Sequence, residues 1–224
     1  MIVRIKRQSA PDAKPYWQNF EYNGSRHVTV SALLDALNYT DDLIDAEGNP
    51  APRIRWECSC MQAVCGGCAM VINGTPALAC NTTVDSLRGD ELVLEPLSKF
   101  PVVADLVVDR SIIYENLTRA GAYLEGAIKA DPKQHEQQYS VAKCLKCGLC
   151  LEVCPNYHRG SDFFGAVFAN ESYLIVGQSE EGSPRMVKEY KKHFGAGCSK
   201  ALSCQTVCPV GIETLTSILR MNRK

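Results

Sequence analysis

Cysteine is the residue type whose number and spacing in this sequence could do chemistry. The chain has 12 cysteines among 224 residues, and they are bunched rather than scattered. Several closely spaced thiols in one chain favour a metal centre, because the thiolate is a strong metal ligand. The three groups are Cys58, Cys60, Cys65, Cys68 and Cys80; Cys144, Cys147, Cys150 and Cys154; and Cys198, Cys204 and Cys208.

The first group contains the spacing Cys60-x4-Cys65-x2-Cys68, followed later by Cys80. This spacing is typical of a plant-type [2Fe–2S] loop whose fourth ligand comes from elsewhere in the chain. Gly66-Gly67 lets the backbone bend tightly between two ligands and direct its amides at the sulfurs. A four-cysteine zinc site is the alternative, but a zinc ribbon normally uses two close pairs. We therefore predict that these four cysteines bind a [2Fe–2S] cluster.

Cys58 is left over from this set. It stands two residues before Cys60, so on a strand both side chains would point the same way. A cluster with four ligands needs no fifth thiol, and free cysteines are often buried as small apolar residues. Cys58 is predicted to be a buried free thiol rather than a ligand.

The second and third groups form a repeated motif. The run Cys144-x2-Cys147-x2-Cys150-x3-Cys154-Pro155 is that of bacterial ferredoxins, in which the fourth cysteine ligates the other cluster of a pair. The later run, Cys198-x5-Cys204-x3-Cys208-Pro209, has Ala201 where the first has Cys147. One thiolate is therefore missing from the pair.

Exchange of the fourth cysteines divides these seven thiols into two ligand sets. One set is complete and predicts a [4Fe–4S] cluster, whereas the other has three thiolates and predicts a [3Fe–4S] cluster. The sets are Cys144, Cys147, Cys150 and Cys208 for the first, and Cys154, Cys198 and Cys204 for the second.

The elements around these motifs differ between the two halves of the chain. The first half shows strand patterns at residues 2–7, 17–22 and 92–94, a hairpin at 69–79 with an Asn73-Gly74 turn, and a helix capped by Ser31. The second half shows helical spacing after Ser111 and at residues 213–221. We expect a small mixed-sheet domain over residues 1–103 and a helical domain over residues 104–224.

Composition and charge exclude several classes of protein. Hydrophobic residues make up 46% of the chain and charged residues 22%, which is ordinary globular usage, and the net charge of -1 provides no footprint for nucleic acid. The N-terminal residues carry Arg4, Lys6 and Arg7 without an apolar core, so we expect no secretion signal and a reducing compartment. The four histidines are far apart and are expected at the surface.

With these motifs in place, the sequence resembles the iron–sulfur subunit of succinate dehydrogenase and fumarate reductase over nearly its whole length. The resemblance implies a plant-ferredoxin-like β-grasp domain followed by an α-helical ferredoxin domain, an α+β chain. The stretches that carry it are Arg4-Ile5-Lys6-Arg7, Lys14-Pro15-Tyr16-Trp17, Cys65-Gly66-Gly67-Cys68-Ala69-Met70, residues 100–103 and 105–109, and both cysteine–proline runs.

The resemblance also implies the setting in which the chain works. It implies a flavoprotein partner with covalent FAD, a membrane anchor, and a peripheral place on the cytoplasmic face of the membrane. Electrons would pass from flavin through [2Fe–2S], [4Fe–4S] and [3Fe–4S] to a quinone bound through the anchor. The dicarboxylate chemistry would lie in the partner, so no catalytic acid or base is expected here.

Two departures from the family pattern concern the quinone. Ubiquinone-reducing relatives usually carry tryptophan shortly after the Cys154 position and histidine directly after the Cys198 position. Here residues 155–158 are Pro-Asn-Tyr-His and Ser199 follows Cys198. The stretch Trp56-Glu57-Cys58 is more similar to the menaquinone-linked branch, in which the anchor carries haem b.

Two other functions are open at this point. Within electron transfer, the same subunit could serve another flavin dehydrogenase or a thiol-linked fumarate reductase, relatives of which often carry extra cysteine-rich domains. In a different class, the thiols could form a zinc-dependent interaction module, which would be colourless whereas iron–sulfur clusters are brown. Zinc sites prefer closed sets of four ligands, and Ala201 leaves one set short.

Overall fold

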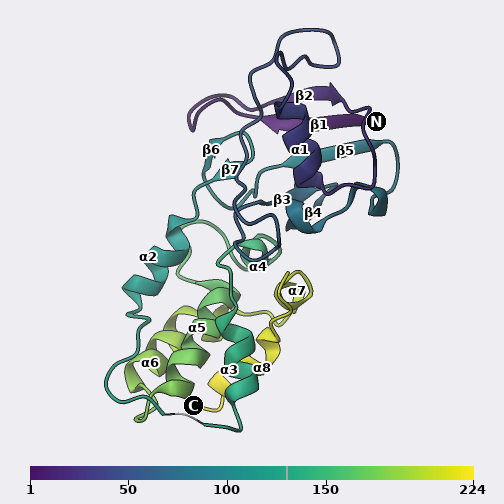
Figure 1. Ribbon diagram of the computed structural model, residues 1–224. Helices are drawn as coiled ribbons and strands as arrows, with labels where there is room; N and C mark the ends of the chain where they lie inside the picture. Colours follow the sequence, from purple (N-terminus) through teal and green to yellow (C-terminus); the bar gives the residue numbers. More distant parts are fainter. Residues whose placement is uncertain (130) are drawn as a thin grey trace. The chain divides into compact units, whose positions relative to one another are not determined.

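The computed structural model describes residues 1–129 and 131–224. They form two compact units, Met1–Asp109 and Arg110–Lys224, the first built on a sheet and the second on helices, which confirms the α+β class (Figure 1). The boundary expected after Val103 lies within a short strand, β6 (Val102–Ala104). Residues that follow it stay with the first unit because Asp105 N donates to Gln8 O at 2.7 Å and Leu106 N donates to Arg55 O at 3.1 Å.

The first unit is a mixed five-stranded sheet in the order β2-β1-β5-β3-β4. β1 pairs in parallel with β5 and antiparallel with β2, and β3 pairs antiparallel with β4 and β5. The predicted strand at residues 2–7 and the Asn-Gly hairpin are confirmed. The strands are β1 (Ile2–Arg7), β2 (Tyr16–Glu21), β3 (Ala69–Ile72), β4 (Thr75–Leu78), β5 (Glu91–Glu95), β6 (Val102–Ala104) and β7 (Val107–Val108).

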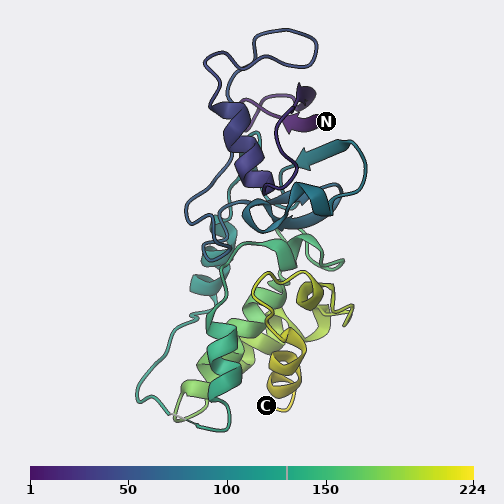
Figure 2. The same ribbon diagram turned by 45° about the vertical axis from the view of Figure 1, so that its right-hand side comes forward.

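Helix α1 (Val30–Asn38) covers one face of this sheet (Figures 1 and 2). The prediction that Ser31 caps it is wrong, because Thr29 takes that place with extended backbone and its Oγ1 accepts from Ala32 N at 3.2 Å. Ser31 is buried inside the first turn. The short 3-10 helices η1 (Ala79–Asn81) and η2 (Val84–Ser86) follow the hairpin.

A buried ion pair fixes the segment that leads into the first cysteine loop. Arg7 is 1% exposed and its Nε lies 3.0 Å from Asp105 Oδ1. The Arg7 guanidinium also donates to the carbonyls of Pro52 and Arg53, and Asp105 accepts from the Arg55 amide. Since each charge is met by hydrogen-bonding partners, this pair can hold β1, residues 52–55 and the β6–β7 hairpin together.

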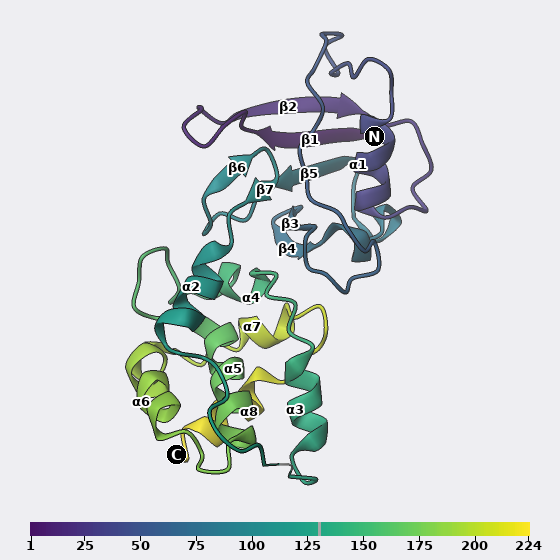
Figure 3. The ribbon, with the colours of Figure 1, turned by 60° about the vertical axis from the view of Figure 1, so that its left-hand side comes forward.

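The second unit packs its helices around α5 (Gly165–Gln178), which contacts α3, α4, α6 and α8 (Figure 3). α5 is apolar on nearly all sides, as expected of a helix in the middle of a core. Among residues 1–129 and 131–224, no helix is both long and apolar enough to cross a bilayer. The other helices are α2 (Ser111–Arg119), α3 (His135–Ala142), α4 (Leu149–Glu152), α6 (Pro184–His193), η3 (Gly195–Gly197), α7 (Ser203–Thr206) and α8 (Thr214–Met221).

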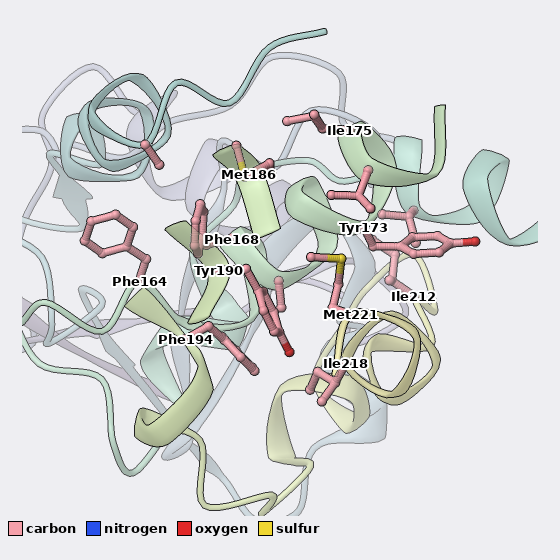
Figure 4. Close-up of a cluster of buried hydrophobic side chains, with 14 residues drawn as sticks. Phe164, Phe168, Tyr173, Ile175, Met186, Tyr190, Phe194, Ile212, Ile218 and Met221 are labelled. Atoms are coloured by element: carbon pink, nitrogen blue, oxygen red, sulfur yellow. The ribbon is translucent and has the colours of Figure 1, made fainter. Parts of the chain in front are cut away.

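The core of this unit is rich in aromatic side chains (Figure 4). The rings of Tyr190 and Phe194 stack with centroids 5.1 Å apart, and those of Phe164 and Phe168 meet edge to face at 5.2 Å. At the start of α5, Gly165 has φ +73°, and a β carbon there would lie 2.3 Å from Leu151 Cδ2. The left-handed backbone favours glycine at this position, and a larger residue would also displace the Leu151 side chain.

One histidine does not lie at the surface. His27, His135 and His158 are exposed, but His193 is buried, so the expectation was wrong for this residue. Its ring stacks on Phe164 at a centroid distance of 4.0 Å, its Nδ1 lies 2.9 Å from Asp162 O, and its Nε2 lies 3.4 Å from Glu189. Both ring nitrogens have partners, which explains how the core accommodates the imidazole.

Candidate metal centres

The first cysteine loop, between residues 57 and 68, brings its predicted ligands together. Cys68 Sγ lies 3.3 Å from Cys80 Sγ, Cys60 hydrogen-bonds to Cys65, and Cys65 is near enough to Cys68 for its charge to raise the pKa of that thiol. Cys80 reaches the loop from η1, just after the β3–β4 hairpin. The four thiols predicted to hold [2Fe–2S] thus form one group.

Backbone amides in this loop point at the sulfurs. Gln62 N and Val64 N donate to Cys60 Sγ at 3.3 and 3.4 Å, and Ala63 N donates to Cys80 Sγ at 3.3 Å. In the same segment Met61 (52°) and Ala63 (59°) have positive φ angles. The loop thus combines strained backbone conformations with N–H groups that donate to sulfur. This combination fits a site for an electron-rich iron–sulfur group.

The thiols of this group differ in acidity for physical reasons. Hydrogen bonds from the amides of Gln62 and Val64 lower the pKa of the Cys60 thiol to about 7. Burial raises the pKa of the Cys68 thiol to about 12. Because metal binding requires thiolates, a bound cation would have to stabilise the charged form of Cys68.

Cys58 is exposed, so the prediction that it is buried is wrong. The pKa of its thiol is raised mainly by partial desolvation and further by the charges of Asp35 and Cys65. Its exclusion from the ligand set stays a prediction.

The second unit presents the two cysteine runs on similar backbone. Cys144 and Cys198 begin loops in which Lys146 (φ 54°) and Lys200 (φ 60°) are left-handed. Each loop leads into a four-residue helix, α4 or α7, and these two helices contact each other (Figure 3). The residues before these helices, Gly148 (φ 88°) and Leu202 (φ 60°), are also left-handed. The repeat seen in the sequence is therefore a repeat of structure.

The structure brings the thiols of the two runs near one another, and their division into two ligand sets stays a prediction. A cavity in the second unit is lined by all four thiols of the complete set and by Cys204. Beyond the effect of burial, the charges of Cys144 and Cys208 raise the pKa of Cys147, and those of Cys154 and Cys198 raise the pKa of Cys204. The charge of Cys204 also raises the pKa of Cys150, so the electrostatics do not separate the two sets. In residues 1–129 and 131–224 no group of three or more His, Cys, Asp or Glu converges on a single-ion position.

Burial is the main cause of the raised pKa values of the thiols around this cavity. It raises the pKa of Cys147 to about 11 and that of Cys150 well above its ordinary value. Burial also raises the pKa of Cys144, although the neighbouring Lys146 ammonium opposes it. Buried and half-buried thiols that share one cavity fit a group that brings positive charge with it, such as an iron–sulfur cluster.

Sequence reasoning missed the charged residues beside this cavity. Lys146 pairs with Glu171 of α5, and both side chains are only 18% exposed. Arg110 Nη1 donates to Cys147 O at 3.4 Å. The position of Lys146 between two ligands could have drawn attention to it, whereas nothing local in the sequence identifies Glu171.

The residues at the family's quinone positions are largely at the surface. Pro155, Asn156, His158 and Ser199 are exposed. Tyr157 is buried, and its pKa is raised by burial and by the nearby Cys150.

Comparisons with known proteins agree with this geometry. Residues 2–115 match the family model of a 2Fe-2S iron–sulfur cluster binding domain, and residues 140–212 match that of a 4Fe-4S dicluster domain. The succinate dehydrogenase iron–sulfur subunit of Bacillus subtilis is 32% identical over 98% of this chain and 90% of that protein. This chain belongs to the succinate dehydrogenase and fumarate reductase iron–sulfur subunit family.

Further matches extend to the fumarate reductase side of the family and to solved structures. The fumarate reductase iron–sulfur subunit of Haemophilus influenzae is 30% identical over 97% of this chain and 90% of that protein. A chain of the Mycobacterium smegmatis Sdh1 complex in the apo form has a TM-score of 0.75 at 22% identity, covering 100% of this chain and 96% of that chain. As a family member, the chain is an electron-transfer subunit of an oxidoreductase.

Proposed function

We propose that this subunit carries electrons between the FAD of a flavoprotein partner and a membrane quinone through three iron–sulfur centres. The [2Fe–2S] centre is assigned to Cys60, Cys65, Cys68 and Cys80 in the first unit, Met1–Asp109. The other two centres are assigned to the second unit, Arg110–Lys224. The [4Fe–4S] centre is assigned to Cys144, Cys147, Cys150 and Cys208, and the [3Fe–4S] centre to Cys154, Cys198 and Cys204.

The observation that carries this proposal is the alanine in the repeated loop. Ala201 occupies the place of Cys147 in a loop with the same left-handed positions and the same following helix. A methyl group cannot ligate iron, so the second site has one thiolate fewer than the first. When bound, iron–sulfur clusters take up and release single electrons, which suits a chain placed between a two-electron flavin and a membrane acceptor.

This chain's own residues hold and tune the centres. The amides of Gln62, Ala63 and Val64 donate to ligand sulfurs in the first unit. In the second unit residues such as Ile113, Val167 and Ile212 form apolar walls beside the thiols, and Lys146 and Arg110 place positive charge near Cys144 and Cys147. No acid–base residue is assigned, because the dicarboxylate chemistry belongs to the partner.

The setting of the complex is part of the proposal. A peripheral position on the cytoplasmic face of the membrane, held by an anchor subunit, brings the third centre near its acceptor. The residues at positions 155–158 and Ser199 lack the tryptophan and histidine of ubiquinone-reducing relatives. We therefore assign menaquinone as the acceptor, reached through haem b in the anchor. A co-purified anchor without haem absorbance would contradict this assignment.

Low-temperature EPR of the anaerobically purified chain tests the three centres. We expect a signal in the air-oxidised sample that vanishes on mild reduction, and a [2Fe–2S] signal that appears on further reduction with dithionite. An EPR-silent oxidised sample would contradict the [3Fe–4S] assignment, since it would mean two complete four-iron centres. A colourless protein containing zinc would contradict the whole proposal.

A further inference from the structure

A buried amide lies in the wall of the cavity that the [4Fe–4S] ligands share. Asn170, on α5, is 3% exposed and lines this cavity together with Cys144, Cys147, Cys150 and Cys208. None of the sequence motifs includes it. A polar side chain in such a place costs free energy unless its donors and acceptors are used.

The hydrogen bonding of Asn170 is incomplete. Its Nδ2 donates to Thr214 Oγ1 at 3.2 Å, in the interior of the second unit. Its Oδ1 is buried and has no hydrogen-bond partner among the described residues. This leaves a buried carbonyl oxygen unpaired on a residue that lines the cavity, whose other polar groups include thiols that would be anionic as ligands.

Rotating the Asn170 side-chain amide by half a turn about its last bond exchanges Oδ1 and Nδ2, and it gives the carbonyl oxygen a partner. Asn170 Oδ1 would then accept from the hydroxyl of Thr214, and the NH2 group would take the place of the unpaired oxygen in the wall of the cavity. Side-chain amides are oriented by their hydrogen-bond networks, and anionic sulfur is an acceptor, so this orientation satisfies both ends of the side chain. Lys146 lines the same cavity but is already paired with Glu171.

We propose that Asn170, oriented by Thr214, donates a hydrogen bond to a sulfur of the [4Fe–4S] centre and raises its midpoint potential. The inference rests on the proposed function, because it requires that centre to be bound by Cys144, Cys147, Cys150 and Cys208. A hydrogen bond to sulfur stabilises the reduced centre more than the oxidised one, since the reduced centre carries more negative charge. Asn170 is thus a tuning residue rather than a ligand.

Potentiometric titration of the loaded full chain, followed by EPR, tests the effect on potential. Asn170→Leu keeps the size of the side chain and removes the donor. We expect the ratio of reduced to oxidised [4Fe–4S] at a fixed ambient potential to fall about tenfold, a shift of ~59 mV for one electron. Ser172→Ala is the matched control on the same helix, because Ser172 is buried and bonds to Met186 Sδ outside this cavity. It should leave the potential unchanged.

Pulsed EPR on the unaltered chain gives a second, independent readout. With 15N-labelled asparagine, the reduced [4Fe–4S] centre should show a weakly coupled nitrogen and exchangeable protons that D2O removes. Thr214→Val should weaken this coupling, because the amide loses the hydroxyl that orients it. This measurement decides the inference even if Asn170→Leu fails to bind the centre.

The outcomes separate this inference from the proposal beneath it. An unaltered chain without any [4Fe–4S] signal overturns the proposed function. A normal [4Fe–4S] signal with no asparagine nitrogen coupling overturns the role of Asn170 alone. So does an Asn170→Leu chain with normal iron content and an unshifted potential.

Discussion

The two cysteine loops of the second unit follow the same backbone path in different surroundings. In the first loop Cys147, Gly148 and Leu149 are buried, and Lys146 reaches back to Glu171 of α5. In the second loop the matching residues are less buried: Ala201 is exposed, and Leu202 and Ser203 are half-buried. Lys200 is exposed whereas Lys146 is half-buried, so the first loop is the more buried of the two.

This difference shows that backbone conformation and ligand chemistry are set separately. Both loops place a left-handed residue before their short helix, but one uses Gly148 and the other Leu202. A left-handed φ angle costs a non-glycine residue about 1–2 kcal/mol. Leu202 therefore keeps this conformation against the backbone preference of leucine. In the proposed ligand sets, by contrast, the number of thiolates differs through a single side chain, Ala201 in place of Cys147.

The largest effect is expected from restoring the missing thiol. Ala201→Cys places sulfur at the position that matches Cys147, so the second centre should bind a fourth iron. We expect the oxidised-state EPR signal to disappear and the iron content to rise by one atom per chain. Quantitative EPR with iron and sulfide analysis measures both. Ser199→Cys adds a thiol away from that position and should leave the signal unchanged.

Removing the matching thiol from the first loop is the reverse test of whether the two cysteine loops are equivalent. Cys147→Ala removes the matching thiol from the first loop and should create a second oxidised-state signal. If Ala201→Cys retains the original signal at full amplitude with unchanged iron content, the two loops are not equivalent. The assignment of Ala201 to the open corner would then be wrong.

A smaller effect is expected from breaking the ion pair beside the first loop. Glu171→Leu leaves the Lys146 ammonium largely buried without its partner, and we expect the free energy of unfolding to fall by about 3 kcal/mol. The double variant Lys146→Met with Glu171→Leu removes both charges and should recover most of the loss. Urea denaturation, followed by far-UV circular dichroism, gives the difference.

The other loop offers the matched control for this ion pair. Lys200 stands at the position of Lys146 but is exposed, so Lys200→Met should change the free energy of unfolding by less than about 0.5 kcal/mol. If the double variant Lys146→Met with Glu171→Leu is as unstable as Glu171→Leu alone, the unpaired Lys146 charge is not the cause of the lost stability.

The parts of the fold that sequence reasoning predicted are those with local signals. Asn73-Gly74 predicted a hairpin because both residues accept positive φ, and they adopt 45° and 77°. The helix of α5 was not placed, because a helix that is apolar on nearly all sides has no amphipathic period. The β6–β7 hairpin was also missed, since its strands are only three and two residues long.

The same distinction holds for the candidate site. The cysteine spacing alone yields a proposed set of ligands, because ferredoxin-type runs and the exchange of their fourth cysteines are recognisable in sequence. Glu171 lies 25 residues from Lys146, and Asn170 meets Thr214 across 44 residues. Such partners are chosen by tertiary packing around α5, and a pattern within one segment does not contain that information.

The smallest effect is expected from the left-handed residue before α4. Gly148 has φ 88°, so Gly148→Ala should lower the free energy of unfolding by about 1–2 kcal/mol through the strain of the added β carbon. Gly195→Ala is the matched control, because Gly195 has no positive φ and a β carbon there meets no atom within 4 Å. Urea denaturation of both variants should show the loss only for Gly148→Ala. Equal stability of the two variants would mean that the first loop tolerates a β carbon at its left-handed position as readily as the second tolerates Leu202. The two loops would then differ in burial but not in backbone strain.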